Sequence, residues 1–384
     1  MFWPKLQQMN IVSYPFPLLI FLFSYAIGFG QEMNLWSVTS SGGAHDSGTI
    51  FYIKSDGTGF TKVHDFDGRS GYPFASLTLA NQTLYGMTLG KDGAGGEGGH
   101  GAIFKINTNG RGFEIIHLFN GANGGTPYGE LIDHKGKLWG MTNKGGAANR
   151  GVIFHIDYDG RSFTKVYDFK GSDGAHPRNS LLVQNGKFWG TTSSGGDNNM
   201  GVIFNLNTDG TQFRTVYDFD KPNGGEPESG LLFSHERFWG MTARGGANNE
   251  GGVYSILANG KGFAKHYDFP YPALGDLIES QGKLWGMVSL RGDDNCGSIF
   301  HINPDGKGFQ TVHNFDCKNG RFPEGNLVES NNLLWGLTRF GGQFNQGVIF
   351  HLRKDGTDFR KVMDFEALTG GIPYSTLIEV PISK

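Results

Sequence analysis

The sequence predicts an all-β fold, a seven-bladed β-propeller of four-stranded antiparallel blades. Three observations lead to this expectation: a short aromatic motif recurs seven times, every period contains four strand-like segments, and the two chain ends hold complementary parts of one period. The clearest copy of the motif is KFWGTTSSGG, at Lys187–Gly196. The steps between its central aromatic residues are 49, 54, 50, 50, 46 and 50 residues. A period near fifty that recurs in this way indicates a repeat architecture. The central residues are Trp36, Tyr85, Trp139, Trp189, Trp239, Trp285 and Trp335.

The third period, from Pro127 to His176, shows its four strands most clearly. Runs of β-branched and aromatic residues alternate with turn signals, including an Asp-Gly pair at Asp159 that is typical of hairpins. Nothing in the chain after the N-terminal segment has the periodicity of a helix. Four short strands in each of seven periods are typical of propeller blades. The expected strands are Tyr128–Ile132, Leu138–Thr142, Val152–Ile156 and Phe163–Phe169.

The chain ends predict how the ring closes. The repeat sequence begins at a second strand, Leu35–Thr39, and stops just after a first strand, Ser375–Val380. We therefore expect the C-terminal strand to join the N-terminal blade, which leaves no open sheet edge between the ends.

Composition agrees with a compact β fold. The 384 residues include 63 glycines and 32 phenylalanines, and 18% are charged. A disordered chain would have fewer aromatic and more charged residues. The formal net charge is -3, so no overall basic field indicates a nucleic-acid partner.

The N-terminus has the features of a signal peptide. Lys5 precedes an apolar run from Ile11 to Phe29, and small residues at Gly28 and Gly30 precede an expected cleavage after Gly30. We expect residues 1–30 to be the signal peptide and residues 31–384 the propeller. The alternative is an uncleaved membrane anchor, which the prolines inside the run disfavour. The prediction is a secreted or periplasmic protein, or one on the cell surface, without stable membrane insertion after cleavage.

The repeat units also resemble a known family. The general pattern of the units is an aromatic-Gly pair followed by Thr, then Gly-Gly, Gly-Val-Ile-Phe, Asp-Gly and Tyr-Asp-Phe, as in the unit around Trp189. This pattern resembles the Gloeo/Verruco (GloVer) tandem repeat of exported bacterial proteins. The resemblance implies a propeller and export, and it brings no established reaction with it. Kelch repeats are similar in pattern, whereas the absence of a Trp-Asp pair argues against WD40 repeats.

Repetition separates scaffold from function, because a residue present in most blades serves the blade. The recurring tryptophans are therefore expected to pack blade on blade rather than to bind sugars. The loops between second and third strands and the links between blades share one end of the ring. They are long and variable, so this end is the candidate functional face.

Basic and aromatic residues gather at that face. Guanidinium groups pair with carboxylate or sulfate and aromatic rings stack on sugars, so this set suits a glycan, including an anionic one. The alternative is an ordinary solvated rim, balanced by nearby acidic residues such as Glu226 and Glu324. The expected ligand-binding residues are Phe74, Lys144, Arg244, Arg291, Arg339 and Tyr374.

An enzymatic alternative is a polysaccharide lyase acting on a uronic-acid glycan. That chemistry needs a base beside a cation that neutralises the uronate carboxylate. The candidate catalytic residues are His176, Tyr128 and Arg178, which flank the starts of first strands.

The two cysteines belong to one period. Cys296 begins a third strand and Cys317 follows the fourth, so a disulfide between them is the preferred interpretation after export. A zinc site with His301 and His313 is the alternative, but both histidines occupy ordinary repeat positions. We expect no metal and no cofactor.

Together these features predict an exported binding module that recognises a glycan or a protein partner on its loop-rich face. The lyase and a purely structural surface repeat protein remain the alternatives.

Overall fold

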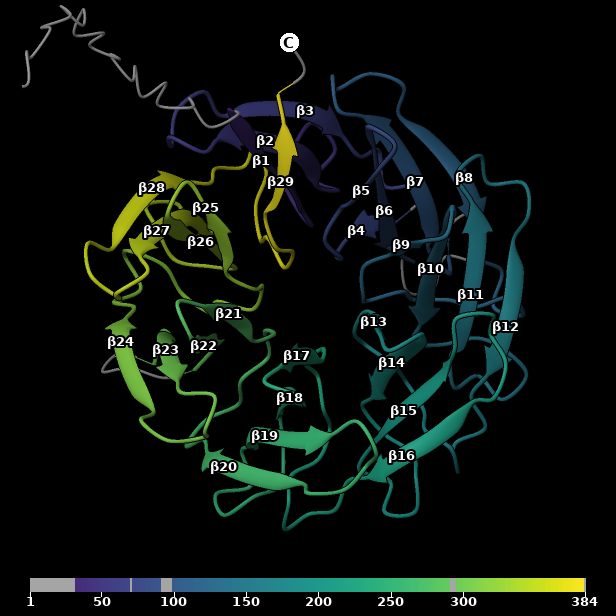
Figure 1. Ribbon diagram of the computed structural model, residues 1–384. Coiled ribbons are helices and arrows are strands. Elements are labelled where there is room, and N and C mark those ends of the chain that lie inside the picture. The colour runs from purple at the N-terminus through teal and green to yellow at the C-terminus, as the bar shows by residue number, and fades with distance from the viewer. Residues whose placement is uncertain (1–31, 70, 91–98, 291–294, 383–384) are drawn as a thin grey trace, which may run out of the picture.

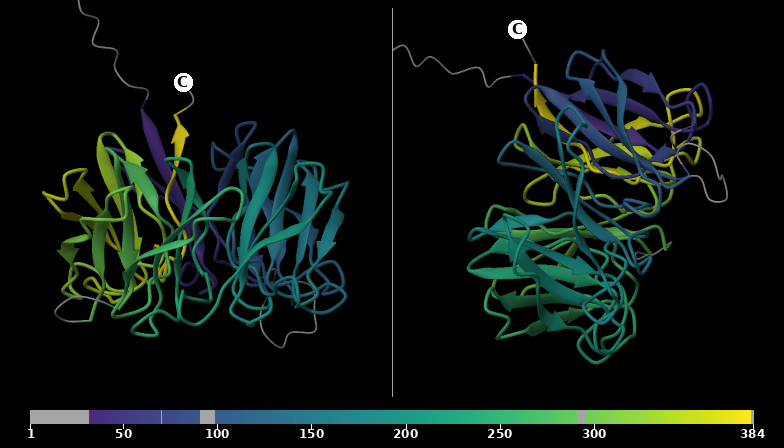
Figure 2. Two further views of the ribbon diagram at one scale, coloured as in Figure 1. Left: turned by 60° about the horizontal axis from the view of Figure 1, so that its bottom comes forward. Right: turned by 90° about the vertical axis from the view of Figure 1, so that its right-hand side faces the viewer.

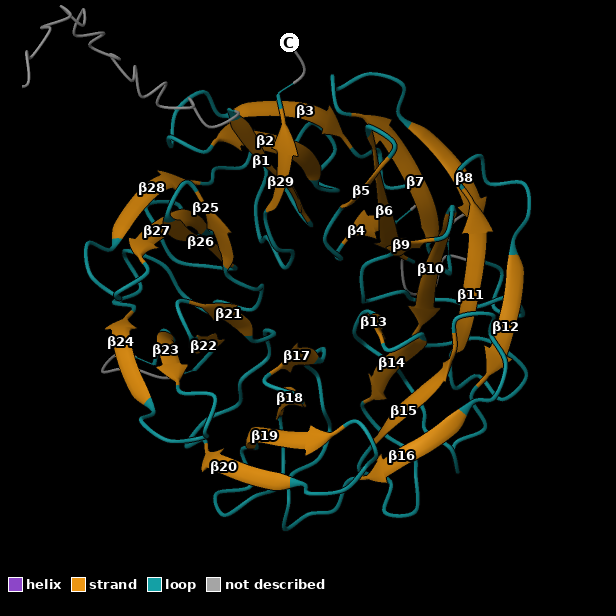
Figure 3. Ribbon diagram, viewed as in Figure 1, coloured by secondary structure: helices purple, strands orange, loops and turns teal. Residues whose placement is uncertain are grey.

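The computed structural model describes residues 32–69, 71–90, 99–290 and 295–382. The expected signal peptide and the candidate ligand-binding residue Arg291 lie outside these ranges. The described strands form seven antiparallel sheets around a central channel (Figure 1), as the sequence predicted. Strands and loops make up the described ring (Figure 3). Within the described ranges there is no helix that is long and apolar enough to span a membrane.

The blades follow chain order. Blade 1 contains β1 (Met33–Thr39), β2 (Thr49–Lys54), β3 (Thr61–Asp65) and β29 (Ile378–Pro381), and blade 2 contains β4 (Tyr72–Pro73), β5 (Thr78–Ala80), β6 (Thr83–Leu89), β7 (Ala102–Asn107) and β8 (Glu114–Leu118). Blade 3 contains β9 (Ile132–His134), β10 (Lys137–Thr142), β11 (Val152–Asp157) and β12 (Thr164–Asp168), and blade 4 contains β13 (Leu182–Gln184), β14 (Lys187–Thr192), β15 (Val202–Asn207) and β16 (Arg214–Asp218). Blade 5 contains β17 (Leu232–Ser234), β18 (Arg237–Thr242), β19 (Gly252–Leu257) and β20 (Ala264–Asp268). Blade 6 contains β21 (Ile278–Ser280), β22 (Lys283–Val288), β23 (Ser298–Ile302) and β24 (Gln310–Asn314), and blade 7 contains β25 (Val328–Ser330), β26 (Leu333–Thr338), β27 (Val348–Arg353) and β28 (Arg360–Asp364).

The C-terminal strand closes the ring, which confirms the predicted closure. β29 pairs antiparallel with β1, with Trp36 opposite Ile378 and Asn34 opposite Val380. The hydroxyls of Ser37 and Ser375 lie 2.7 Å apart in a buried hydrogen bond that ties the same two segments together. Two chain segments more than 330 residues apart thus form one sheet.

The recurring tryptophans pack between blades, as expected. Trp139 of β10 is 4% exposed and lies against Phe188 of the next blade, with 4.4 Å between ring centroids. The glycine that follows six of the seven aromatic residues has a steric reason. A Cβ atom on Gly140 would lie 2.7 Å from the ring of Phe154, so a larger residue would displace the aromatic core.

The two kinds of loop at the candidate functional face lie side by side. Isolated bridges join the link before a first strand to the loop after the second strand of the same blade, as in Gly125 with Lys144 and Gly225 with Arg244. Figure 2 (left) shows these loops at the lower end of the ring, opposite the end from which the C-terminal strand leaves. We call this end the loop-rich face.

The first strands are shorter than the sequence predicted. Tyr128–Ile132 was the expected strand, but β9 begins at Ile132, and the segment before it leaves the sheet to line the channel. The physical reason is a competing hydrogen bond: the amide of Glu130 donates to Ser180 Oγ of the next blade at 3.0 Å instead of to β10. Pro127, which has no amide hydrogen, also cannot join the ladder.

Deleting residues 378–384 should destabilise the protein by about 3–5 kcal/mol, because β1 loses its partner strand and the buried Val380 and half-buried Ile378 lose their packing. The freed edge of β1 should also promote association. Denaturant unfolding and size-exclusion chromatography measure the two effects. Deleting residues 383–384 alone is the control, and equal stability of the two truncated proteins would contradict the closure by β29.

Candidate functional site

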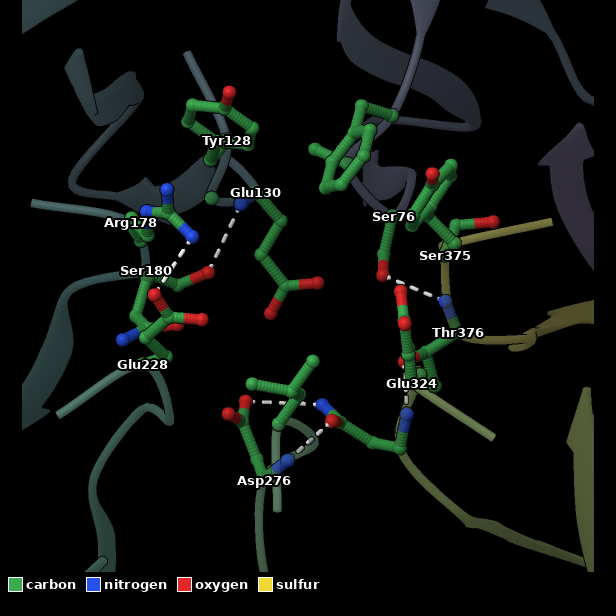
Figure 4. A pocket seen from close by; sticks show the side chains of 18 of the residues that line it. Ser76, Tyr128, Glu130, Arg178, Ser180, Glu228, Asp276, Glu324, Ser375 and Thr376 are labelled. Carbon is green, nitrogen blue, oxygen red and sulfur yellow. Dashed lines mark hydrogen bonds and ion pairs between the residues drawn. The ribbon is translucent and has the colours of Figure 1, made fainter. Parts of the chain in front are cut away.

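A cavity of about 390 Å³ lies in the central channel at the loop-rich face. All seven blades contribute to its wall, and Figure 4 shows their side chains converging on one space. We call it the central pocket. Its size and its mixture of aromatic, charged and hydroxyl groups are typical of a small-ligand site.

One short motif builds the wall in every blade. The sequence Pro-x-x-x-Leu precedes each first strand, with Ala273 in place of proline in blade 6. The chain runs from the loop-rich face into the channel, so the residue after the proline lies at the mouth and the third residue lies deeper. The mouth ring is Phe74, Tyr128, Arg178, Glu228, Leu274, Glu324 and Tyr374. The deep ring is Ser76, Glu130, Ser180, Gly230, Asp276, Asn326 and Thr376.

Hydrogen bonds between neighbouring blades hold the deep ring together. In each closed step, the backbone amide of one member donates to the side-chain oxygen of the next member around the ring. Five of the seven steps are closed in this way. They are Glu130 to Ser180 at 3.0 Å, Gly230 to Asp276 at 2.6 Å, Asp276 to Asn326 at 2.6 Å, Asn326 to Thr376 at 2.8 Å, and Thr376 to Ser76 at 2.9 Å.

The other two steps are open. Glu130 does not accept from the amide of Ser76, and Gly230 has no side chain that could accept from the amide of Ser180. Within the described ranges, neither amide has a hydrogen-bond acceptor. The Glu130 carboxyl group instead points into the middle of the pocket, and no hydrogen bond from another described residue reaches it (Figure 4).

Aromatic rings form one side of the mouth. Phe74 stacks on Tyr374 with 4.1 Å between ring centroids, and it meets Tyr128 edge to face at 5.1 Å. These residues come from the link that precedes β29, from blade 2 and from blade 3, so the aromatic wall covers one arc of the ring. Such a wall suits stacking against the apolar face of a sugar or another flat ligand.

Ion pairs flank this wall. Arg178 lies 2.8 Å from Glu228, and Arg339, from the loop after β26, lies 3.3 Å from Glu324. Both guanidinium groups also lie near aromatic rings, at 5.1 Å from Tyr128 and 4.2 Å from Tyr374. Because both cations already have carboxylate partners, they contribute less net positive charge than the sequence suggested.

Burial shifts the acidic groups of the pocket toward the neutral form. It raises the pKa of Glu130 to about 7, and the nearby Asp276 carboxylate adds to the increase. Burial also raises the pKa of Asp276 despite its hydrogen bonds from Gly230 and Asn326. The pKa values of Glu228 and Glu324 are raised by burial too, with Arg178 and Arg339 opposing the shift. Four carboxyl groups face two guanidinium groups, which disfavours an anionic ligand.

The structure brings together part of the predicted ligand-binding set. Phe74, Tyr374 and Arg339 line the central pocket. Arg244 lines an adjoining cavity of about 450 Å³, together with Arg339, and pairs with Glu226 at 3.0 Å. Lys144 is exposed and lines neither cavity.

The three catalytic candidates do not meet. Tyr128 and Arg178 line the central pocket, but His176 does not. The Nδ1 atom of His176 lies 2.9 Å from the carbonyl oxygen of Asn143, and its Nε2 atom lies 3.5 Å from Arg150 Nη1. His176 is thus held in the loops beside the pocket, and a base for lyase chemistry is missing from the position that the sequence suggested.

Sequence reasoning missed the deep ring, and Glu130 and Asp276 above all. The signal was present as Pro-x-x-x-Leu in six blades and its Ala273 variant in blade 6. The third residue after the proline is mostly small and polar, and Glu130 and Gly230 depart from this pattern, which could have identified them.

The cysteines are bonded to each other. Cys296 and Cys317 form a disulfide with their Cα atoms 5.3 Å apart, within the usual range. His301 and His313, the other members of the zinc alternative, have separate contacts: His301 Nε2 lies 2.9 Å from Lys283 Nζ, and His313 stacks on Phe359. Among the described residues, no group of three or more His, Cys, Asp or Glu side chains is placed to hold a metal.

Glu130 should contribute a part of the free energy of unfolding that falls as the pH rises from about 4.5 to about 7. Over this range the folded protein keeps a proton on Glu130 that the unfolded chain, with a Glu pKa of 4.5, has released. Histidines whose pKa burial lowers, such as His117 and His313, act in the opposite sense, and Glu130→Gln leaves them unchanged. The free energy of unfolding of Glu130→Gln minus that of the wild type should therefore rise with pH over this range. Thermal unfolding across this range provides the measurement. Parallel profiles for both proteins would contradict the assignment to Glu130.

Solved structures with the same architecture include bacterial enzymes. The periplasmic gluconolactonase of Pseudomonas aeruginosa superposes with a TM-score of 0.61 at 16% identity, covering 91% of this chain and 99% of that chain. A puromycin-hydrolysing peptidase of Mycobacterium tuberculosis superposes with a TM-score of 0.56 at 10% identity, covering 86% of this chain and 51% of that chain. At these identities the likeness concerns the fold alone.

A search of curated protein sequences finds no significant match. The model of the Gloeobacter/Verrucomicrobia repeat matches three overlapping segments, residues 24–185, 93–276 and 270–381, which together span the propeller. The chain therefore belongs to the Gloeobacter/Verrucomicrobia repeat family.

Proposed function

We propose that this protein is an exported carbohydrate-binding propeller whose central pocket takes up one sugar unit, either free or at the end of a glycan. The observation that carries this proposal is the aromatic wall of Phe74, Tyr374 and Tyr128 beside a ring of carboxyl, hydroxyl and amide groups. Carbohydrates present an apolar ring face and a polar edge, and this pocket offers a surface for each.

The charges favour a neutral sugar over an anionic one. Arg178 and Arg339 are paired with Glu228 and Glu324, and Glu130 and Asp276 add further acidic groups. A uronate or sulfate would have to compete with these carboxylates for the guanidinium groups. The proposal therefore places neutral sugars first.

The volume also bears on the kind of partner. A cavity of about 390 Å³ matches a small molecule or a single residue of a polymer. Recognition of a protein partner would use the surrounding loops more than the pocket. The lyase alternative is less favoured, because His176 is bonded to Asn143 outside the pocket.

Tyr374→Ala should weaken sugar binding about tenfold, because the ligand loses one side of the aromatic wall. Saturation-transfer NMR with glucose, galactose, mannose, gluconolactone and glucuronate, followed by titration calorimetry, measures the effect. We expect the neutral sugars to bind more tightly than glucuronate.

Phe344→Ala is the matched control, because Phe344 is an exposed aromatic residue in the loop after β26 that does not line the central pocket. Equal losses in the two variants would argue against binding in the pocket. Saturation transfer to none of the sugars with the wild-type protein would overturn the proposed function.

A further inference from the structure

The deep ring departs from its own pattern at Glu130 and Gly230. At the closed steps, a short polar side chain such as that of Ser76 or Thr376 accepts a hydrogen bond from the backbone amide of the preceding ring member. Glutamate at position 130 extends past that amide, and glycine at position 230 offers no acceptor. The hydrogen bonds of the closed steps hold neighbouring blades together. Glu130 and Gly230 do not make this bond as acceptors, so these two positions are candidates for a role in ligand binding.

The two open amides differ from the other five amides of the deep ring. A backbone amide without a partner loses free energy unless water or a ligand accepts its hydrogen. The five closed steps satisfy the equivalent amides with protein atoms, so they are unavailable to a ligand. Among the described deep-ring members, the amides of Ser76 and Ser180 are the backbone donors that a bound molecule can still use.

These donors flank Glu130. Ser76 belongs to blade 2, Glu130 to blade 3 and Ser180 to blade 4, so the order along the ring is donor, acceptor, donor. All three residues line the central pocket. This arc lies below the aromatic wall, because Phe74 and Tyr128 occupy the mouth positions of blades 2 and 3.

Asp276, the other acidic residue of the deep ring, accepts hydrogen bonds from protein atoms. Asp276 accepts a hydrogen bond from the Gly230 amide at 2.6 Å through Oδ1 and one from the Asn326 side-chain amide at 3.0 Å through Oδ2. The carboxyl group of Glu130 has no such partner among the described residues, and it points to the centre of the pocket (Figure 4). The groups that face it are Asp276, Arg178, Glu228, Glu324 and Tyr128, and the guanidinium group of Arg178 is taken up by Glu228.

We propose that Glu130 and the backbone amides of Ser76 and Ser180 form the sugar-recognising floor of the pocket, which binds adjacent hydroxyl groups of a neutral sugar. Glu130 accepts hydrogen bonds from two neighbouring hydroxyls, and the amides donate to their oxygen atoms. The sugar ring then lies against Phe74, Tyr128 and Tyr374. This inference rests on the proposed function and adds the residues that select the ligand.

Glu130→Thr tests the floor directly. Thr376, in the same ring position, accepts the amide of Asn326 at 2.8 Å, so a threonine at position 130 should accept the amide of Ser76 and close that step. We expect sugar binding to fall at least 30-fold while the melting temperature stays equal or rises. The probe is whichever of glucose, galactose or mannose gives the strongest saturation transfer with the wild-type protein.

Glu366→Thr is the matched control, because it makes the same substitution at an exposed glutamate that does not line the central pocket. Its affinity should stay within about twofold of wild type. If Glu130→Thr binds sugar like wild type while Tyr374→Ala does not, the proposed floor is wrong and the proposed function stands. A lower melting temperature for Glu130→Thr would overturn the open-step interpretation, even without a sugar that binds.

Gly230→Ser tests the second amide without touching Glu130. Its hydroxyl should accept from the amide of Ser180, and its Cβ would lie 3.0 Å from Asp276 Oδ2, so a small shift of that carboxylate suffices. We expect a loss of affinity of about fivefold with a folded protein, verified by its melting temperature. Unchanged affinity would show that the Ser180 amide does not bind the sugar.

Discussion

Packing of aromatic residues between blades is the interaction on which the rest of the structure depends. A single blade cannot bury its central aromatic residue, and Trp139 is covered by Phe188 of the next blade. Every blade therefore needs a neighbour on both sides, and a ring is the arrangement in which all have one. β29 supplies the last neighbour by pairing with β1. The central pocket exists because this closure brings seven equivalent entry segments, with different side chains, to one axis.

Strict repetition limits what such a ring can recognise, because seven equal residues around an axis offer no distinct site. This chain breaks the repetition at the residues that the core does not use. The mouth ring is aromatic on one arc and charged or apolar on the other, and the deep ring is open at the steps from Ser76 to Glu130 and from Ser180 to Gly230. The aromatic wall extends from the link before β29 to blade 3, and the open steps lie between blades 2 and 3 and between blades 4 and 5. The central pocket is therefore asymmetric around the channel axis.

Fold prediction succeeded where residues act locally. The Trp-Gly pairs and Asp-Gly turns fixed the strands of each blade, and the position of Ser375–Val380 in the repeat fixed the closure. The beginning of the first strand of blade 3 was predicted too early, at Tyr128 instead of Ile132. The backbone amide of Glu130 donates a hydrogen bond to Ser180 of the next blade, and this takes the segment out of the sheet. The positions of the candidate site residues were predicted only in part, because they too depend on contacts between blades. Phe74, Tyr374 and Arg339 line the pocket, while His176 was expected there but is bonded to Asn143 in the adjoining loops.

The sequence by itself determined the number of blades, the strand order within each, and the family, because these follow from a pattern repeated along the chain. Tertiary structure decided which guanidinium groups pair with carboxylates, which amides donate to the next blade, and that the Glu130 carboxyl group has no hydrogen-bond partner among the described residues. Those properties depend on pairs of residues that are not neighbours in the chain, such as Glu324 and Arg339, 15 positions apart, and Arg178 and Glu228, 50 positions apart. A pattern along the chain specifies each member of such a pair, but only the closed ring sets the distance between them.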